Sequence, residues 1–77
     1  MATTTRPLYE IAADIERAWP KVNFGARPYL DAMHSLNSID DNYGLDSARS
    51  IVLYFLSNAS TFRGEDAKRL KAELKAL

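Results

Sequence analysis

The single histidine, His34, is the side chain best able to act as an acid or a base near neutral pH. Asp31 lies three residues before it, so the two side chains can pair on a helix. Catalysis also needs a positioned nucleophile or substrate group, and the adjacent Ser35 points about 100° away around a helix. We therefore interpret Asp31 and His34 as an ordinary surface pair. We predict no catalytic residue and a protein that is not an enzyme.

Three aspartates and an asparagine in residues 40–46 invite comparison with a calcium-binding loop. An EF-hand loop needs glycine at its sixth position, and placing Gly44 there puts Ile39 at the first ligand position. No glutamate follows at the end of such a loop. The pattern is instead typical of a turn followed by a helix with Asp46 as its N-cap. We predict no metal site and no cofactor.

Positive charge gathers toward the C-terminal end, where residues 63–77 contain five basic and three acidic side chains. A helix-turn-helix arrangement would let the last helix read DNA through this charge. The ten acidic and ten basic residues of the whole chain cancel, however, and a domain that binds a DNA groove usually carries a clear basic excess. Weak DNA binding is therefore the alternative function; otherwise these side chains solvate the helix and complement its dipole. The candidate nucleic-acid-binding residues are Lys68, Arg69, Lys71 and Lys75.

Aromatic side chains are numerous for a chain of 77 residues. A small helical core holds only part of them, and those left outside would form a surface suited to protein contact. The alternative is that each ring is half buried with its hydroxyl group in water. With two nearby arginines, the candidate protein-interaction residues are Tyr9, Trp19, Tyr43, Arg49, Phe62 and Arg63.

Four helices are expected to position these residues. Apolar side chains at helical spacing predict the first helix over residues 7–19, between Pro7 and Pro20. Pro28 marks the start of the second, over residues 27–37. The third covers residues 46–59, and the fourth covers residues 62–77 after a cap at Thr61.

The residues from Ile51 to Leu56 are apolar in every direction around a helix. A buried strand is the other reading, but a lone strand would leave its backbone unpaired and no second strand-like segment is evident. We therefore predict an all-α fold, a compact four-helix domain wrapped around this central apolar helix. A single domain covers residues 1–77, with residues 1–5 disordered.

Length and composition restrict the setting of the protein. A chain of 77 residues is near the size at which one core is only just sufficient, so an oligomer interface would add useful buried area. The absence of cysteine suits a reducing cytoplasm, and the N-terminal residues lack the pattern of a signal peptide. The longest apolar run is far shorter than the roughly 20 residues that cross a bilayer. We expect a protein of the bacterial cytoplasm that makes no membrane contact.

Residues 24–33 and 41–52, continuing through residues 58–64, resemble a group of small proteins of unassigned function from actinobacteria and their bacteriophages. The more specific motifs are Tyr-Gly-x-Asp-Ser-x-Arg-Ser from Tyr43 and Thr-aromatic-Arg-Gly from Thr61. In that group the position of Phe62 is often tryptophan and that of Leu45 often alanine. The resemblance implies a phage or prophage accessory protein and no particular site. We therefore expect a protein-protein interaction module that binds an unidentified host or phage protein, or a second copy of itself as a homodimer.

Overall fold

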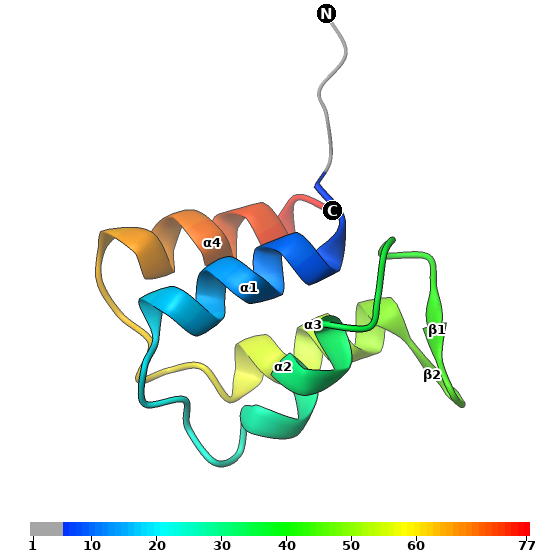
Figure 1. The fold of residues 1–77 in the computed structure, drawn as a ribbon, viewed down its shortest axis with the longest axis horizontal. Coiled ribbons are helices and arrows are strands. Elements are labelled where there is room, and N and C mark those ends of the chain that lie inside the picture. Colours follow the sequence, from blue (N-terminus) through cyan, green and yellow to red (C-terminus); the bar gives the residue numbers. More distant parts are fainter. Residues whose placement is uncertain (1–5) are drawn as a thin grey trace, which may run out of the picture.

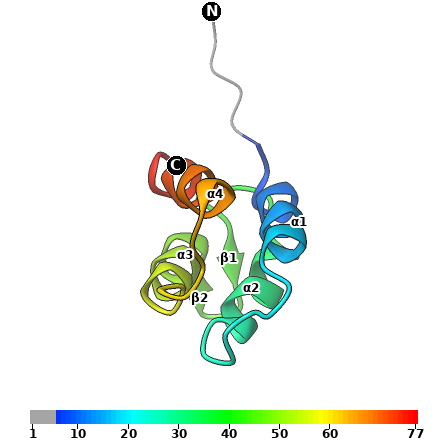
Figure 2. The same ribbon diagram turned by 90° about the vertical axis from the view of Figure 1, so that its left-hand side faces the viewer.

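The computed structural model describes residues 6–77 and contains four helices and one short hairpin (Figure 1). Helices α1 and α4 lie side by side in one layer, and α2 and α3 form the other (Figure 2). The fold is therefore mostly helical, as predicted; the predicted disorder of residues 1–5 lies outside the described residues. The elements are α1 (Leu8–Ala18), α2 (Arg27–Met33), β1 (Asn42–Tyr43), β2 (Asp46–Ser47), α3 (Ala48–Ser57) and α4 (Glu65–Lys75).

Helix α1 agrees with the prediction to within one residue at each end, whereas α2 ends at Met33 rather than near Asn37. After Met33 the chain turns, and the carbonyl groups of Leu36 and Asn37 accept hydrogen bonds from the backbone of Tyr9 and Leu8 at 3.0 and 2.8 Å. The first N–H groups of a helix lack partners within it. The end of the α2 segment therefore supplies partners to the start of α1 instead of continuing as a helix.

The hairpin of β1 and β2 was not predicted. Its strands are antiparallel, with Tyr43 opposite Asp46, and are joined by the two-residue turn Gly44-Leu45. Gly44 has a φ of 63°, which fits a turn with glycine at the first central position. Asp46 is therefore a strand residue and not the predicted N-cap of α3. That role belongs to Ser47, whose hydroxyl oxygen accepts from the backbone N–H of Ser50 at 3.1 Å.

Helix α4 begins at Glu65, three residues later than predicted. Gly64 occupies the N-cap position with a φ of 109°, and no side chain caps the helix, so the predicted cap at Thr61 is wrong. The preceding segment turns inward to bury Phe62, which is 2% exposed. Helix α3 ends at Ser57, so residues 58–64 connect the two helices.

The core consists only of apolar side chains in the described part of the chain. At its centre the ring of Trp19 stacks on Phe62, with centroids 4.9 Å apart, and meets Phe55 edge-on at 6.2 Å. Of the apolar run in α3, Ile51, Val52 and Phe55 are buried, but Leu53 and Tyr54 are 58% and 51% exposed. The prediction that the other helices wrap this segment on all sides is therefore not confirmed.

An ion-pair cluster joins α4 to α1. The guanidinium group of Arg6 donates to both carboxylate oxygens of Glu73, at 2.7 and 2.8 Å, and to Asp14 at 2.7 Å. These hydrogen bonds lower the pKa of each carboxyl group below its ordinary value. Arg6 thereby ties the segment before α1 to the last turns of α4.

Within residues 6–77, no helix has the combination of length and apolar character that spanning a membrane requires.

Replacing Phe55 with alanine should lower the free energy of unfolding by about 3–5 kcal/mol, because it removes a fully buried ring from the aromatic centre. Urea denaturation measures the loss. Leu53→Ala is the matched control on the same helix, since Leu53 is 58% exposed, and it should cost far less. A Phe55→Ala protein as stable as the parent would contradict the position of α3.

Glu73→Gln should reduce the acid sensitivity of the fold. A folded pKa below the unfolded value means that the ion pair contributes fully above the ordinary glutamate pKa of about 4.3 and is lost as pH falls through the folded pKa. The parent should therefore lose stability more steeply than the variant between about pH 5 and pH 3. Denaturation at several pH values tests this, with Glu10→Gln as control because Glu10 is exposed. Superimposable pH profiles for parent and Glu73→Gln would count against the role of Arg6.

Candidate functional site

His34 contacts Glu16 rather than Asp31. Its Nε2 atom lies 2.9 Å from Oε1 of Glu16, while Asp31 accepts from Arg27, which also binds Glu16 at 2.7 Å. The predicted Asp31–His34 pair is therefore wrong. The hydrogen bond from His34, and next the charge of Arg27, lower the pKa of Glu16. This cluster holds α1 against α2. Within residues 6–77, His34 is not hydrogen-bonded to a hydroxyl group that it could activate as a nucleophile.

The aspartate-rich loop before the hairpin is organised by backbone contacts. Asp41 accepts hydrogen bonds from the backbone N–H groups of Asn37 and Ser38, at 2.9 and 3.0 Å, and these bonds lower its pKa. Such contacts are the turn chemistry expected from the sequence. Across the described residues, no three His, Cys, Asp or Glu side chains gather as a metal site would require.

The structure divides the predicted protein-interaction residues. Trp19 and Phe62 are 6% and 2% exposed and stack on each other in the core, so their predicted place on an interaction surface is corrected. Tyr9 on α1 and Tyr43 on β1 are about half exposed but belong to separate elements. The other two members of the set, Arg49 and Arg63, are exposed.

The predicted nucleic-acid-binding residues are also divided. Arg69 lies on the side of α4 that faces α1, where it pairs with Asp66 at 3.5 Å and shares a hollow with Asp14. Lys68, Lys71 and Lys75 follow one another at helical spacing on the other side of α4. The four cations therefore do not form one face.

Five cations from the two predicted sets instead share one face, which we call the cationic face: Arg49, Arg63, Lys68, Lys71 and Lys75. Two cavities lie on it. The first, the Arg49 cavity, has a volume of about 140 Å³ and lies between α3 and α4. The second, the Arg63 cavity, has a volume of about 420 Å³ and lies at the start of α4. The Arg49 cavity is lined by Ile39, Arg49, Val52, Leu53, Leu56, Leu74, Lys75 and Leu77, and the Arg63 cavity by Phe62, Arg63, Gly64, Glu65, Ala67, Lys68 and Lys71.

Lys71 lines the Arg63 cavity and lies one helical turn before Lys75, which lines the Arg49 cavity. Its ammonium group donates to the carbonyl oxygen of Phe62 at 2.7 Å and lies 5.7 Å from the centre of that ring. Burial lowers the pKa of Lys71, and the positive charges of Lys75 and Arg63 lower it further. Lys71, Lys75 and Arg63 are therefore close enough to repel one another.

None of these five cations has a carboxylate partner in the part of the chain that the structure describes. Of the ten Lys and Arg residues, four are paired within the described chain, namely Arg6, Arg17, Arg27 and Arg69. Lys21 is the one other unpaired cation of the described chain. Positive charge without a carboxylate partner is thus concentrated on one face, around two cavities whose lining includes a single carboxylate side chain, that of Glu65.

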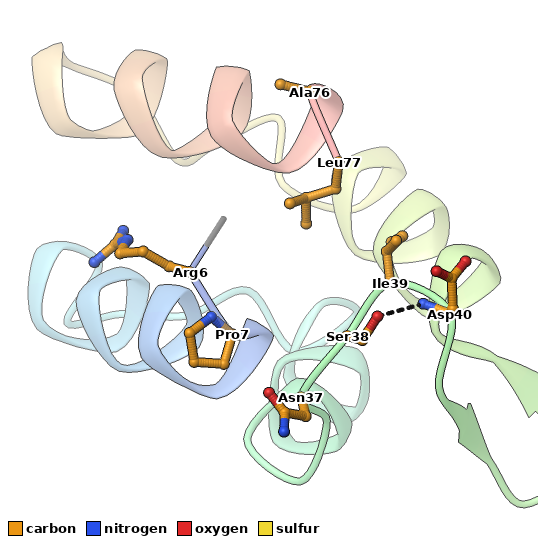
Figure 3. Close-up of a pocket in the computed structure, with 8 residues that line it drawn as sticks. All are labelled: Arg6, Pro7, Asn37, Ser38, Ile39, Asp40, Ala76 and Leu77. Carbon is orange, nitrogen blue, oxygen red and sulfur yellow. Dashed lines mark hydrogen bonds between the residues drawn. The ribbon is translucent and has the colours of Figure 1, made fainter. Parts of the chain in front are cut away.

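A third cavity, of about 370 Å³, lies where the segment before α1 meets the end of α4 and the loop after α2 (Figure 3). Arg6 contributes to its lining, but Figure 3 shows the guanidinium group directed away from Asn37 and Ser38. That group is occupied by Asp14 and Glu73. The cavity therefore lacks the unpaired cations that distinguish the cationic face.

The cationic face was missed because Arg49 and Lys75 are far apart in the sequence and belonged to different predicted sets. One signal was present: Lys68, Lys71 and Lys75 share a helical side that excludes Arg69. No protein-family model, curated protein or solved structure matches the chain.

The side-chain titration of Lys71 should report the crowding of positive charge. We expect its pKa below the ordinary 10.5, and we expect Lys75→Gln and Arg63→Gln each to raise it by removing a neighbouring charge. NMR shifts of the lysine side-chain carbons against pH measure this. Titration at the ordinary value, unaffected by either substitution, would show that the cations do not interact.

Proposed function

We propose that this protein is a non-enzymatic protein-interaction module and that it binds its partner through the cationic face. The observation that carries the proposal is the set of five cations without carboxylate partners in residues 6–77, placed around two apolar cavities. Mutual repulsion among these charges opposes folding, so the arrangement has a cost that a partner would remove.

The chemistry of the face indicates the chemistry of the partner. Carboxylates on the partner would pair with the exposed cations, which steers association and fixes register. Apolar side chains between those carboxylates would fill the two cavities and supply most of the binding free energy. The fitting partner is therefore a protein surface that combines acidic and apolar side chains.

The same partner would complete the surroundings of α3. Leu53 is 58% exposed, and Leu56 is only partly buried against the core. Both line the Arg49 cavity, so a protein bound there would cover them. In such a complex the apolar run of α3 would be packed from several directions, as its composition predicts.

The resemblance to small actinobacterial and phage proteins supports a more specific role. We propose a phage or prophage accessory protein that acts in the cytoplasm of the host cell by binding a host or phage protein or a second copy of itself. This part of the proposal depends on the Tyr-Gly-x-Asp-Ser-x-Arg-Ser and Thr-aromatic-Arg-Gly motifs.

Weak DNA binding is the second candidate, and the alignment of Lys68, Lys71 and Lys75 favours it. Two features favour a protein partner instead. Residues 58–64 form a longer connection than the three to four residues or so of a helix-turn-helix. Apolar cavities among the cations also offer nothing to a phosphate backbone, which is recognised by charge and hydrogen bonds.

A pull-down from an actinobacterial lysate to which the untagged protein has been added, with and without nuclease, tests the function. The tagged parent protein should retain a protein that survives nuclease treatment. Arg49→Glu combined with Lys75→Glu should abolish retention, because it reverses two charges of the face, whereas Lys21→Glu should not.

Retention that persists in the Arg49→Glu/Lys75→Glu protein would overturn the assignment to this face. Material that disappears with nuclease, together with salt-dependent binding of a short DNA duplex, would establish the second candidate.

A further inference from the structure

The hairpin and the loop before it carry the charge that the cationic face lacks. Residues 35–48 contain three aspartates and no lysine or arginine. Asp41 is engaged by backbone N–H groups, but Asp40 and Asp46 are exposed, and neither forms an ion pair within residues 6–77. Acidic and basic surfaces without internal partners are therefore both present on one chain.

The hairpin also carries an apolar tip. Leu45 is fully exposed, at 106% of its reference area, and Tyr43 beside it is 47% exposed. The positive φ of Gly44 sets the two-residue turn, so Leu45 is presented on a short hydrogen-bonded element rather than on a loose loop. Leu45 and Tyr43 together expose apolar area at the tip of the hairpin, and a partner that covered this area would gain its burial.

The Arg49 cavity is of a size to accept an apolar side chain, and its charge is opposite to that of the segment that carries Leu45. Its volume is about 140 Å³. An engineered apolar cavity of ~150 Å³ in another protein takes up benzene, so the Arg49 cavity is large enough for an apolar side chain. Leu53, Leu56 and Leu74 line it together with the cations Arg49 and Lys75. An apolar side chain flanked by carboxylates is the complement of such a site.

We propose that the partner at the cationic face is a second copy of this chain, whose hairpin inserts Leu45 into the Arg49 cavity and brings Asp40 and Asp46 to Arg49 and Lys75. The inference rests on the proposed function and names its partner. Leu45 does not fill the cavity of its own molecule, because it is fully exposed.

The positions of hairpin and cavity allow a symmetric dimer. Ile39 and Arg49, which precede and follow the hairpin in the sequence, both line the cavity, so the two features lie at the same end of the molecule. Figure 1 shows the hairpin at the N-terminal end of α3. Two copies related by a twofold axis therefore make the hairpin–cavity contact twice.

Sedimentation of the untagged protein over a range of concentrations tests the association. The mass should rise toward twice the 8.7 kDa of one chain, and about 0.5 M salt should weaken the dimer by screening its ion pairs. Leu45→Ser and Lys75→Glu should each weaken the dimer at least about tenfold. A monomer at every concentration would overturn the proposal.

Two controls distinguish this contact from nonspecific association through exposed side chains. Phe24 is 91% exposed and belongs to the connection between α1 and α2. Figure 1 shows this connection on the opposite side of the molecule from the hairpin, so Phe24→Ser should leave the dimer unchanged. Lys21→Glu is the matched control for charge. Equal weakening by Leu45→Ser and Phe24→Ser would overturn the assigned contact.

Cysteine pairing maps the contact directly, because the chain contains no cysteine of its own. A mixture of Leu45→Cys and Leu53→Cys proteins should form a mixed disulfide under mild oxidation, whereas Phe24→Cys with Leu53→Cys should not. Equal yields from the two mixtures would contradict insertion of the hairpin at α3.

The outcomes distinguish this inference from the proposed function. If the protein is monomeric but still retains a lysate protein through Arg49 and Lys75, the cationic face is a binding site for another protein and the dimer is wrong. If neither association nor retention depends on Arg49 and Lys75, both proposals fail.

Discussion

The stacking of Phe62 on Trp19 is the contact on which the rest of the structure depends. Phe62 lies in the connection between α3 and α4, so holding its ring in the core decides where that connection turns and where α4 begins. Gly64 then makes the turn with a positive φ, and Lys71 reaches back to the carbonyl group of Phe62. With α4 placed in this way, its lysines lie beside Arg63 and its last turn lies beside Arg49.

Helix α4 has two sides of different electrostatic character. Toward α1, Arg6 and Arg17 neutralise Asp14 and Glu73, and Arg69 pairs with Asp66. Toward α3, the positive charges have no such partners within the described residues, and the pKa of Lys71 is lowered as a result of burial and of its neighbours. A formal net charge of zero therefore conceals an acidic segment from Asp40 to Asp46 and a basic face. Composition alone argues against an electrostatic role, whereas the distribution of charge supports one.

The sequence predicts those features that neighbouring residues decide and misses those that distant contacts decide. Prolines and apolar spacing were enough for α1. The early end of α2 depends on the N–H groups of Leu8 and Tyr9, and the late start of α4 depends on the burial of Phe62. Residue type likewise could not separate Trp19, which is buried, from Tyr9, which is half exposed. Among the candidate site residues, the sequence identified the basic side chains but assigned them to the wrong groups. The cationic face combines residues of α3 and α4, which only the fold brings together.

The incompletely buried leucines Leu53 and Leu56 and the unpaired cations around them are best explained together, as one binding surface. A chain of 77 residues buries only a modest core, so covering Leu53 and Leu56 would add useful stability. The surrounding cations disfavour association with an apolar partner that lacks carboxylates, because such a partner would bury the positive charges unpaired. A partner must therefore carry carboxylates beside its apolar side chain, placed so that they meet the cations when that side chain is buried. In the described chain, the segment from Asp40 to Asp46, which contains the hairpin turn and the loop before the hairpin, places an exposed leucine between exposed aspartates.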